Sequence, residues 1–138
     1  MAIIIKDDAF YLETNTTSYV FCLYNGVPVH LYYGEKVTAD NLTHLIDRQI
    51  YGFCPFDRDI GVTALINSLS TEYSGANSGD YRPAGLDIVD AAGHIGCRLT
   101  CVGYEKSPGV AVLPDDLPAS RPFGTCETLV LTLTDANK

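Results

Sequence analysis

The stretch 78–84 places oppositely charged side chains where they could build a recognition loop. Asp80 and Arg82 are two residues apart, and a carboxylate and a guanidinium at this spacing can form charge-assisted hydrogen bonds. Gly79 permits backbone conformations that other residues avoid, and Pro83 favours an extended conformation for Arg82. The stretch therefore predicts an ordered loop, which on a β-rich scaffold would suit recognition of a partner or ligand.

Other residues that could bind metal or catalyse a reaction are present but poorly spaced. If Cys97 and Cys101 lie on one strand, they are about 13 Å apart at roughly 3.3 Å per residue, whereas one zinc ion needs ligands about 2.3 Å from itself. Buried structural cysteines are the better interpretation. Glycoside hydrolysis needs two carboxylates flanking the scissile bond, and no acidic pair stands on a scaffold that predicts this. We therefore expect no catalytic residue, metal or cofactor.

Aromatic side chains are frequent between residues 51 and 81, where hydrophobic periodicity fades and turn residues accumulate. Tyr51, Phe53 and Tyr81 belong to this segment. Exposed together, such residues would form an interface patch or a platform on which sugars stack. Packing within the loop itself is the alternative, since aromatic rings carry large apolar areas.

The charge balance narrows the choice of partners. The chain has 17 acidic and 9 basic residues, with a formal net charge of −8. This argues against nucleic acid and against anionic membrane surfaces, and leaves neutral sugars or other proteins. Five cysteines and an N-terminus without the pattern of a signal peptide predict reduced thiols and a cytoplasmic location.

The pattern of elements favours an all-β sandwich with one short helix. Asn25-Gly26 is a strong hairpin signal, and at the chain's end leucines 129, 131 and 133 alternate with more polar residues as in a half-buried strand. A helix is expected only at 40–48, with Asp40 as its cap. Segment 62–69 is either a short strand or a helical turn. The predicted strands are 9–14, 18–24, 27–33, 86–89, 95–104, 109–113 and 127–134.

Several fragments together resemble the N-terminal domain of glycoside hydrolase family 36 α-galactosidases, of the melibiase and raffinase type. Each fragment is weak alone, but their order and spacing are fairly specific, and they extend over nearly the whole chain. They are Asn25-Gly26, His30-Leu31-Tyr32-Tyr33-Gly34, Asp47-Arg48, Leu69-Ser70-Thr71-Glu72-Tyr73, Gly79-Asp80-Tyr81-Arg82-Pro83-Ala84, Leu117-Pro118-Ala119 and Glu127-Thr128-Leu129.

The resemblance implies a non-catalytic part of a β-supersandwich that precedes a catalytic barrel, so residues 1–138 would be a fragment of a larger enzyme. It also implies a homo-oligomer, a tetramer in the family, in which Asp47 and Arg48 reach the galactose site of a neighbouring subunit. Pairing of Asp47 with Arg48, or capping of local backbone, is the alternative. Asp80 and Arg82 would order their loop. Two other functions stay open as hypotheses. The chain could be a stand-alone carbohydrate-binding or interaction module, or a purely structural oligomerisation domain.

Overall fold

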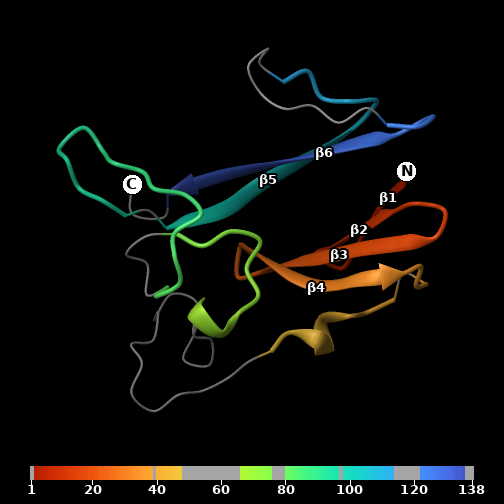
Figure 1. Ribbon diagram of the computed structural model, residues 1–138, viewed down its shortest axis with the longest axis horizontal. Coiled ribbons are helices and arrows are strands. Elements are labelled where there is room, and N and C mark those ends of the chain that lie inside the picture. Colours follow the sequence, from red (N-terminus) through yellow and green to blue (C-terminus); the bar gives the residue numbers. More distant parts are fainter. Residues whose placement is uncertain are drawn as a thin grey trace.

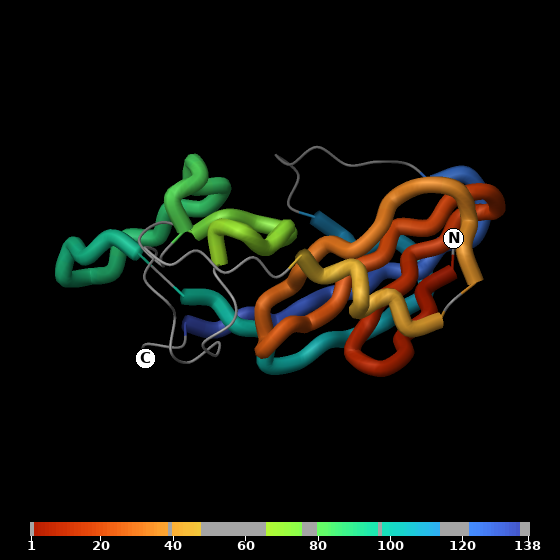
Figure 2. Tube along the Cα trace, turned by 90° about the horizontal axis from the view of Figure 1, so that it is seen from below, coloured from red at the N-terminus to blue at the C-terminus, as the bar shows by residue number. Residues whose placement is uncertain are grey.

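Two antiparallel sheets form the described part of the protein, and they lie one above the other as two layers (Figure 1, Figure 2). The computed structural model describes residues 2–38, 40–47, 66–75, 80–96, 98–113 and 122–135. The larger sheet has the strand order β1-β2-β3-β4, and the smaller is the hairpin β5-β6. The all-β sandwich predicted from the sequence is therefore confirmed. The strands are β1 (Ala2–Lys6), β2 (Ala9–Glu13), β3 (Thr17–Tyr24), β4 (Val27–Glu35), β5 (Leu99–Pro108) and β6 (Glu127–Asp135).

Two tight turns connect strands of the larger sheet. Asn25 and Gly26 have φ angles of 49° and 81°, the left-handed pair that a two-residue hairpin needs between β3 and β4. Asp7 and Asp8, with φ angles of 50° and 60°, make the corresponding turn between β1 and β2. Strand β1 was not predicted from the sequence, because Asp-Asp lacks the glycine that makes such a turn easy to recognise.

One face of the larger sheet carries a buried core. Tyr11, Val20 and Val29 are at most 1% exposed and pack with Leu69, which comes from the segment that covers this face. Leu42, Ile46 and Ile66 are partly buried against the same cluster. The core therefore holds both 40–47 and 66–71 against the sheet. Its buried members are Ala9, Tyr11, Val20, Cys22, Val27, Val29 and Leu69.

The opposite face of the larger sheet is covered by the β5-β6 hairpin. Phe10 meets Tyr104 of β5 edge to face, with ring centroids 5.0 Å apart. The Cys101 amide donates a 2.7 Å hydrogen bond to the carbonyl of Gly26. A side chain at Gly26 would place its Cβ 3.2 Å from Thr100, so glycine permits both the turn and this close approach.

Three predicted elements differ from the structure. A helix was predicted at 40–48, but the described part, 40–47, contains one 3-10 turn, η1 (Thr43–Leu45), because the backbone at Ile46 is extended. A second 3-10 turn, η2 (Ile66–Ser68), lies in the segment whose conformation was left open. The strands predicted at 86–89 and 109–113 are not formed; the first has isolated bridges at Leu86 and Val89.

The predicted strands differ from the observed ones at several ends, by one residue in β2, β3 and β6 and by more in β4 and β5. β4 continues to Glu35, and β5 begins at Leu99 rather than at residue 95 and continues to Pro108. Among the described residues, no helix has the length and apolar content needed to cross a bilayer.

Candidate functional site

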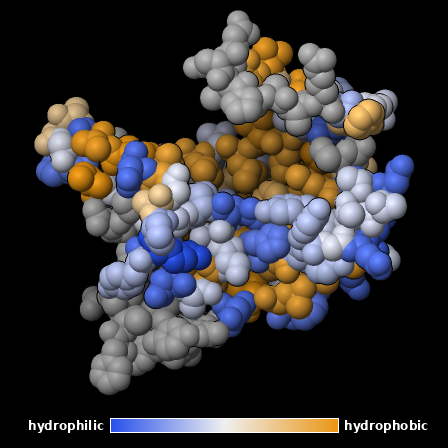
Figure 3. All heavy atoms as spheres, in the orientation of Figure 1, coloured by the Kyte–Doolittle hydropathy of each residue, from blue (hydrophilic) through white to orange (hydrophobic). Residues whose placement is uncertain are grey.

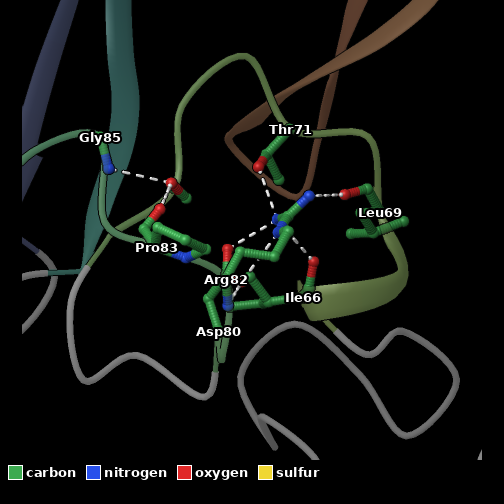
Figure 4. Close-up of polar contacts among 8 residues, drawn as sticks. Ile66, Leu69, Thr71, Asp80, Arg82, Pro83 and Gly85 are labelled. Atoms are coloured by element: carbon green, nitrogen blue, oxygen red, sulfur yellow. Dashed lines mark hydrogen bonds and ion pairs between the residues drawn. The ribbon is translucent and has the colours of Figure 1, made fainter.

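Asp80 and Arg82 form a tight pair in the loop between the two sheets (Figure 4). The Arg82 Nη2 and Nε atoms donate to the two oxygens of Asp80 at 2.6 Å and 2.8 Å. The Arg82 backbone amide also donates to Asp80 Oδ1, at 3.1 Å. The side chain of Asp80 is fully buried, whereas that of Arg82 is 35% exposed. Two hydrogen bonds from the guanidinium and one from the backbone amide of Arg82 therefore hold the buried carboxylate.

The remaining donors of Arg82 connect this pair to the segment 66–71. Nη1 donates to the Leu69 carbonyl at 2.7 Å. Nη2 donates to the Ile66 carbonyl at 3.2 Å and to Thr71 Oγ1 at 2.8 Å. Figure 4 shows the guanidinium between these acceptors and Asp80. Arg82 therefore joins two chain segments that are 11 to 16 residues apart in the sequence.

Electrostatics keep both partners charged. Burial works to raise the pKa of the Asp80 carboxyl, but the hydrogen bonds from Arg82 outweigh it, so this pKa lies below its ordinary value. The bonds to Asp80 raise the pKa of Arg82. The Asp80 oxygens and the Arg82 N–H groups form hydrogen bonds within the protein. The ion pair is therefore suited to holding backbone segments together rather than to transferring a proton.

A second contact ties the far side of the same loop. Ser74 Oγ donates to the Pro83 carbonyl at 2.6 Å and accepts from the Gly85 amide at 2.9 Å. From Gly85 to Gly96 the chain extends away from both sheets (Figure 1, Figure 2). Ser74 therefore fixes the root of this extension through Pro83 and Gly85.

A polar cluster that the sequence analysis missed lies where segment 66–75 meets the larger sheet. Glu72 accepts a short hydrogen bond from the Tyr19 hydroxyl and lies 3.4 Å from His30 Nδ1. The ring centroids of Tyr19 and His30 are 4.9 Å apart. Burial and the bond to Glu72 raise the pKa of Tyr19 to about 12. Tyr19, His30 and Glu72 are too far apart in the sequence for a local pattern to predict their contact. Each nevertheless lies in a predicted strand or in one of the sequence fragments named above.

Of the other residues predicted for the site, Asp47 and Tyr81 are described and the rest are not. Asp47 is exposed and directly follows Ile46, which packs against the core. Tyr81 is 71% exposed, although its neighbours Asp80 and Arg82 turn inward. Arg48, Tyr51 and Phe53 lie outside the described residues, as does Cys97 of the cysteine pair. Within the described part of the chain, no three His, Cys, Asp or Glu side chains gather closely enough to hold a metal ion.

An apolar cleft of about 430 Å³ separates the two sheets. Figure 3 shows apolar side chains gathered in the upper half of the view, around β5 and β6. Glu72 and Glu127 are the carboxylates that line the cleft. The leucines of β6 face it while Val130, Thr132 and Thr134 are exposed, so the predicted alternation is present. The apolar lining residues include Ile3, Leu12, Phe21, Pro28, Leu129, Leu131 and Leu133.

Two stacked antiparallel sheets and a loop ordered by Arg82 define the class of this protein, a β-sandwich domain. The sequence profile of the glycosyl hydrolase family 36 N-terminal domain matches residues 26–138. The chain therefore belongs to this family.

The similar proteins are much longer than this chain. The bifunctional alpha-galactosidase/sucrose kinase AgaSK of Mediterraneibacter gnavus is 32% identical over 143 aligned residues, which cover 99% of this chain and 15% of that protein. The solved galactosidase domain of AgaSK has a TM-score of 0.85 at 30% identity, covering 99% of this chain and 20% of that one. A variant of the alpha-galactosidase AgaA from Geobacillus stearothermophilus, in complex with raffinose, has a TM-score of 0.77 at 25% identity, covering 94% and 18%.

Proposed function

We propose that this chain is a non-catalytic part of an enzyme that hydrolyses terminal α-galactosides of the melibiose and raffinose type. The observation that carries the proposal is the similarity to the AgaSK galactosidase domain, of which the chain covers 20%. In this proposal the catalytic carboxylates belong to the rest of that enzyme. The isolated chain is then expected to show no turnover of an aryl α-galactoside, and turnover above the blank would contradict the proposal.

Assembly into a homo-oligomer is the second part of the proposal. The extension 85–96 leaves the body of the sandwich and exposes apolar side chains, with Val89 59% and Ile95 58% exposed. Tyr81, at the start of the same loop, is 71% exposed. Apolar area of this kind on a projecting segment is typical of a protein interface. Light scattering on the full-length enzyme tests this: a Val89→Asp change should shift the oligomer towards smaller species, and an unchanged mass would count against this surface.

Asp47 is the residue we propose for the rim of the neighbouring subunit's galactose site, with Arg48 beside it. The support is that its carboxylate is exposed while the residue before it is anchored in the core. A carboxylate can accept hydrogen bonds from two sugar hydroxyls. Roles for Tyr51 and Phe53 at this interface stay predictions from the sequence.

Kinetics of the full-length enzyme test the proposed role of Asp47. Loss of one charge-assisted hydrogen bond of about 1.5 kcal/mol raises KM about tenfold. We expect this for Asp47→Ala with an aryl α-galactoside. Glu105→Ala, which removes an exposed carboxylate on β5 outside the extension 85–96, is the matched control and should leave KM unchanged. An unchanged KM in Asp47→Ala would leave a purely structural role for the domain.

A stand-alone carbohydrate-binding module is the second candidate. Tyr33 is 68% exposed, and its ring centroid lies 6.0 Å from that of Tyr19, an arrangement that could stack on a sugar. Calorimetry with galactose and raffinose distinguishes the two. Clear binding by the isolated chain favours the module, whereas no binding favours a domain that needs the rest of its enzyme. The cytoplasmic location stays a prediction from the cysteine content, and cell fractionation tests it.

A further inference from the structure

We propose that Arg82 is a positioning residue for Asp47, acting through the buried cluster that contains Leu69 and against which Ile46 packs. This inference rests on the sugar contact proposed for Asp47. It assigns to the Asp80–Arg82 pair a role in substrate affinity, although neither residue would touch the sugar.

Asp47 is anchored to the protein core through the residue that precedes it. Asp47 is exposed and directly follows Ile46, so the position of its backbone depends on how Ile46 is held. That backbone is held by Ile46, which packs against the core cluster, and the same cluster contains Leu69 and is contacted by Ile66. Close-packed interiors transmit displacement because they contain little free volume. A shift of the segment 66–69 would therefore move the support of Asp47.

Arg82 holds segment 66–69 in place. Its backbone makes two local bonds, from the Leu69 amide to the Ile66 carbonyl at 3.1 Å and from the Thr71 amide to the Leu69 carbonyl at 2.9 Å. Arg82 donates to the same two carbonyls. The guanidinium thus reinforces a single turn of 3-10 helix, a structure with poor hydrogen-bond geometry of its own.

Holding segment 66–69 in this way requires an arginine at position 82. The planar fork of a guanidinium presents five donors in fixed directions, whereas lysine is a compact point charge on a flexible stem. Arg82 reaches Asp80, Ile66, Leu69 and Thr71 simultaneously. A lysine could keep an ion pair with Asp80 but could not hold the two carbonyls as well.

The experiment measures KM and kcat for an aryl α-galactoside in the full-length enzyme, with Arg82→Lys, Asp47→Ala and the double variant. We expect Arg82→Lys to raise KM severalfold with little change in kcat, as when ground-state and transition-state binding are weakened equally. In the Asp47→Ala background the same change should add no further rise, because the contact that it misplaces is already absent. Thr128→Ala, which removes a comparable hydroxyl tie to Gly109 and Ala111 away from Arg82 and from the extension 85–96, should leave KM unchanged.

Three results would overturn the inference. The effects of Arg82→Lys and Asp47→Ala on KM could be additive, which would make Arg82 a general stabiliser. Arg82→Lys could leave KM unchanged while Asp47→Ala raises it, which would remove the positioning role but keep the sugar contact. If Asp47→Ala itself leaves KM unchanged, the proposed sugar contact fails, and this inference fails with it.

Discussion

Replacing Asp80 by asparagine should weaken the attachment of segment 66–75 by about 2 kcal/mol. An asparagine oxygen can still accept from the Arg82 amide and from Nε, but its NH₂ group would face Nη2, which lies 2.6 Å from the carboxylate oxygen. One charge-assisted hydrogen bond is lost, which costs about 1.5–3 kcal/mol. The lower part of that range applies, because the Arg82 side chain is 35% exposed and water can solvate it.

Native-state hydrogen exchange of the full-length enzyme measures this change. Two hydrogen bonds join segment 66–75 to β4: the Glu72 amide donates to the Pro28 carbonyl, and the His30 amide donates to the Ser70 carbonyl. A loss of about 2 kcal/mol in local opening free energy should speed their exchange about 30-fold.

The paired amides of β5 and β6 should exchange at their original rate. Equal acceleration there would show global rather than local destabilisation, and unchanged exchange at Glu72 and His30 would refute the reasoning. Asp87→Asn is the matched control, since its carboxylate is exposed.

The remaining predictions concern pH. Because the pKa of Asp80 is lowered, its contribution to stability is present above its ordinary value of 3.8 and is lost as pH falls through the lower folded-state value; acid titration of segment 66–75 by hydrogen exchange checks this, and Asp80→Asn should abolish the dependence. Tyr19 has its pKa raised to about 12, so the stability linked to its proton is complete below pH 10.0 and disappears as pH rises to about 12. Phenolate absorbance should show this late titration, and Glu72→Gln should move it towards 10.0; a Tyr19 midpoint already at 10.0 in the parent protein would contradict the assignment. Hydrogen bonds from the Ile3 amide and Lys106 lower the pKa of Glu127, so the contact between β1 and the hairpin should weaken as pH falls below 4.5; exchange of the Ile3 amide that stays constant with pH would contradict this.

The parts of the fold that depend on local pattern could be predicted from the sequence. Asn25-Gly26 specifies its hairpin because both residues must adopt positive φ. The helix expected at 40–48 fails for a tertiary reason. Asp40 accepts from the Asn41 amide at 2.8 Å instead of capping a helix, and the Tyr11 hydroxyl donates to the Asp40 carbonyl. Core packing of Ile46 in an extended conformation then ends the turn. Short-range propensity cannot register a tyrosine 29 residues away.

The candidate site shows the same division between local and distant contacts. The spacing of Asp80 and Arg82 is sufficient to predict that they pair, because the two side chains are neighbours in any extended loop. The acceptors at Ile66 and Leu69 could not be predicted, since they are backbone carbonyls and carry no side-chain signature. Yet these acceptors separate the two roles open to Arg82. An arginine bound to Asp80 alone orders its own loop. One that also holds Ile66 and Leu69 is connected to the cluster against which Ile46 packs, and can influence the position of Asp47. The double variant of Arg82 and Asp47 measures that difference directly.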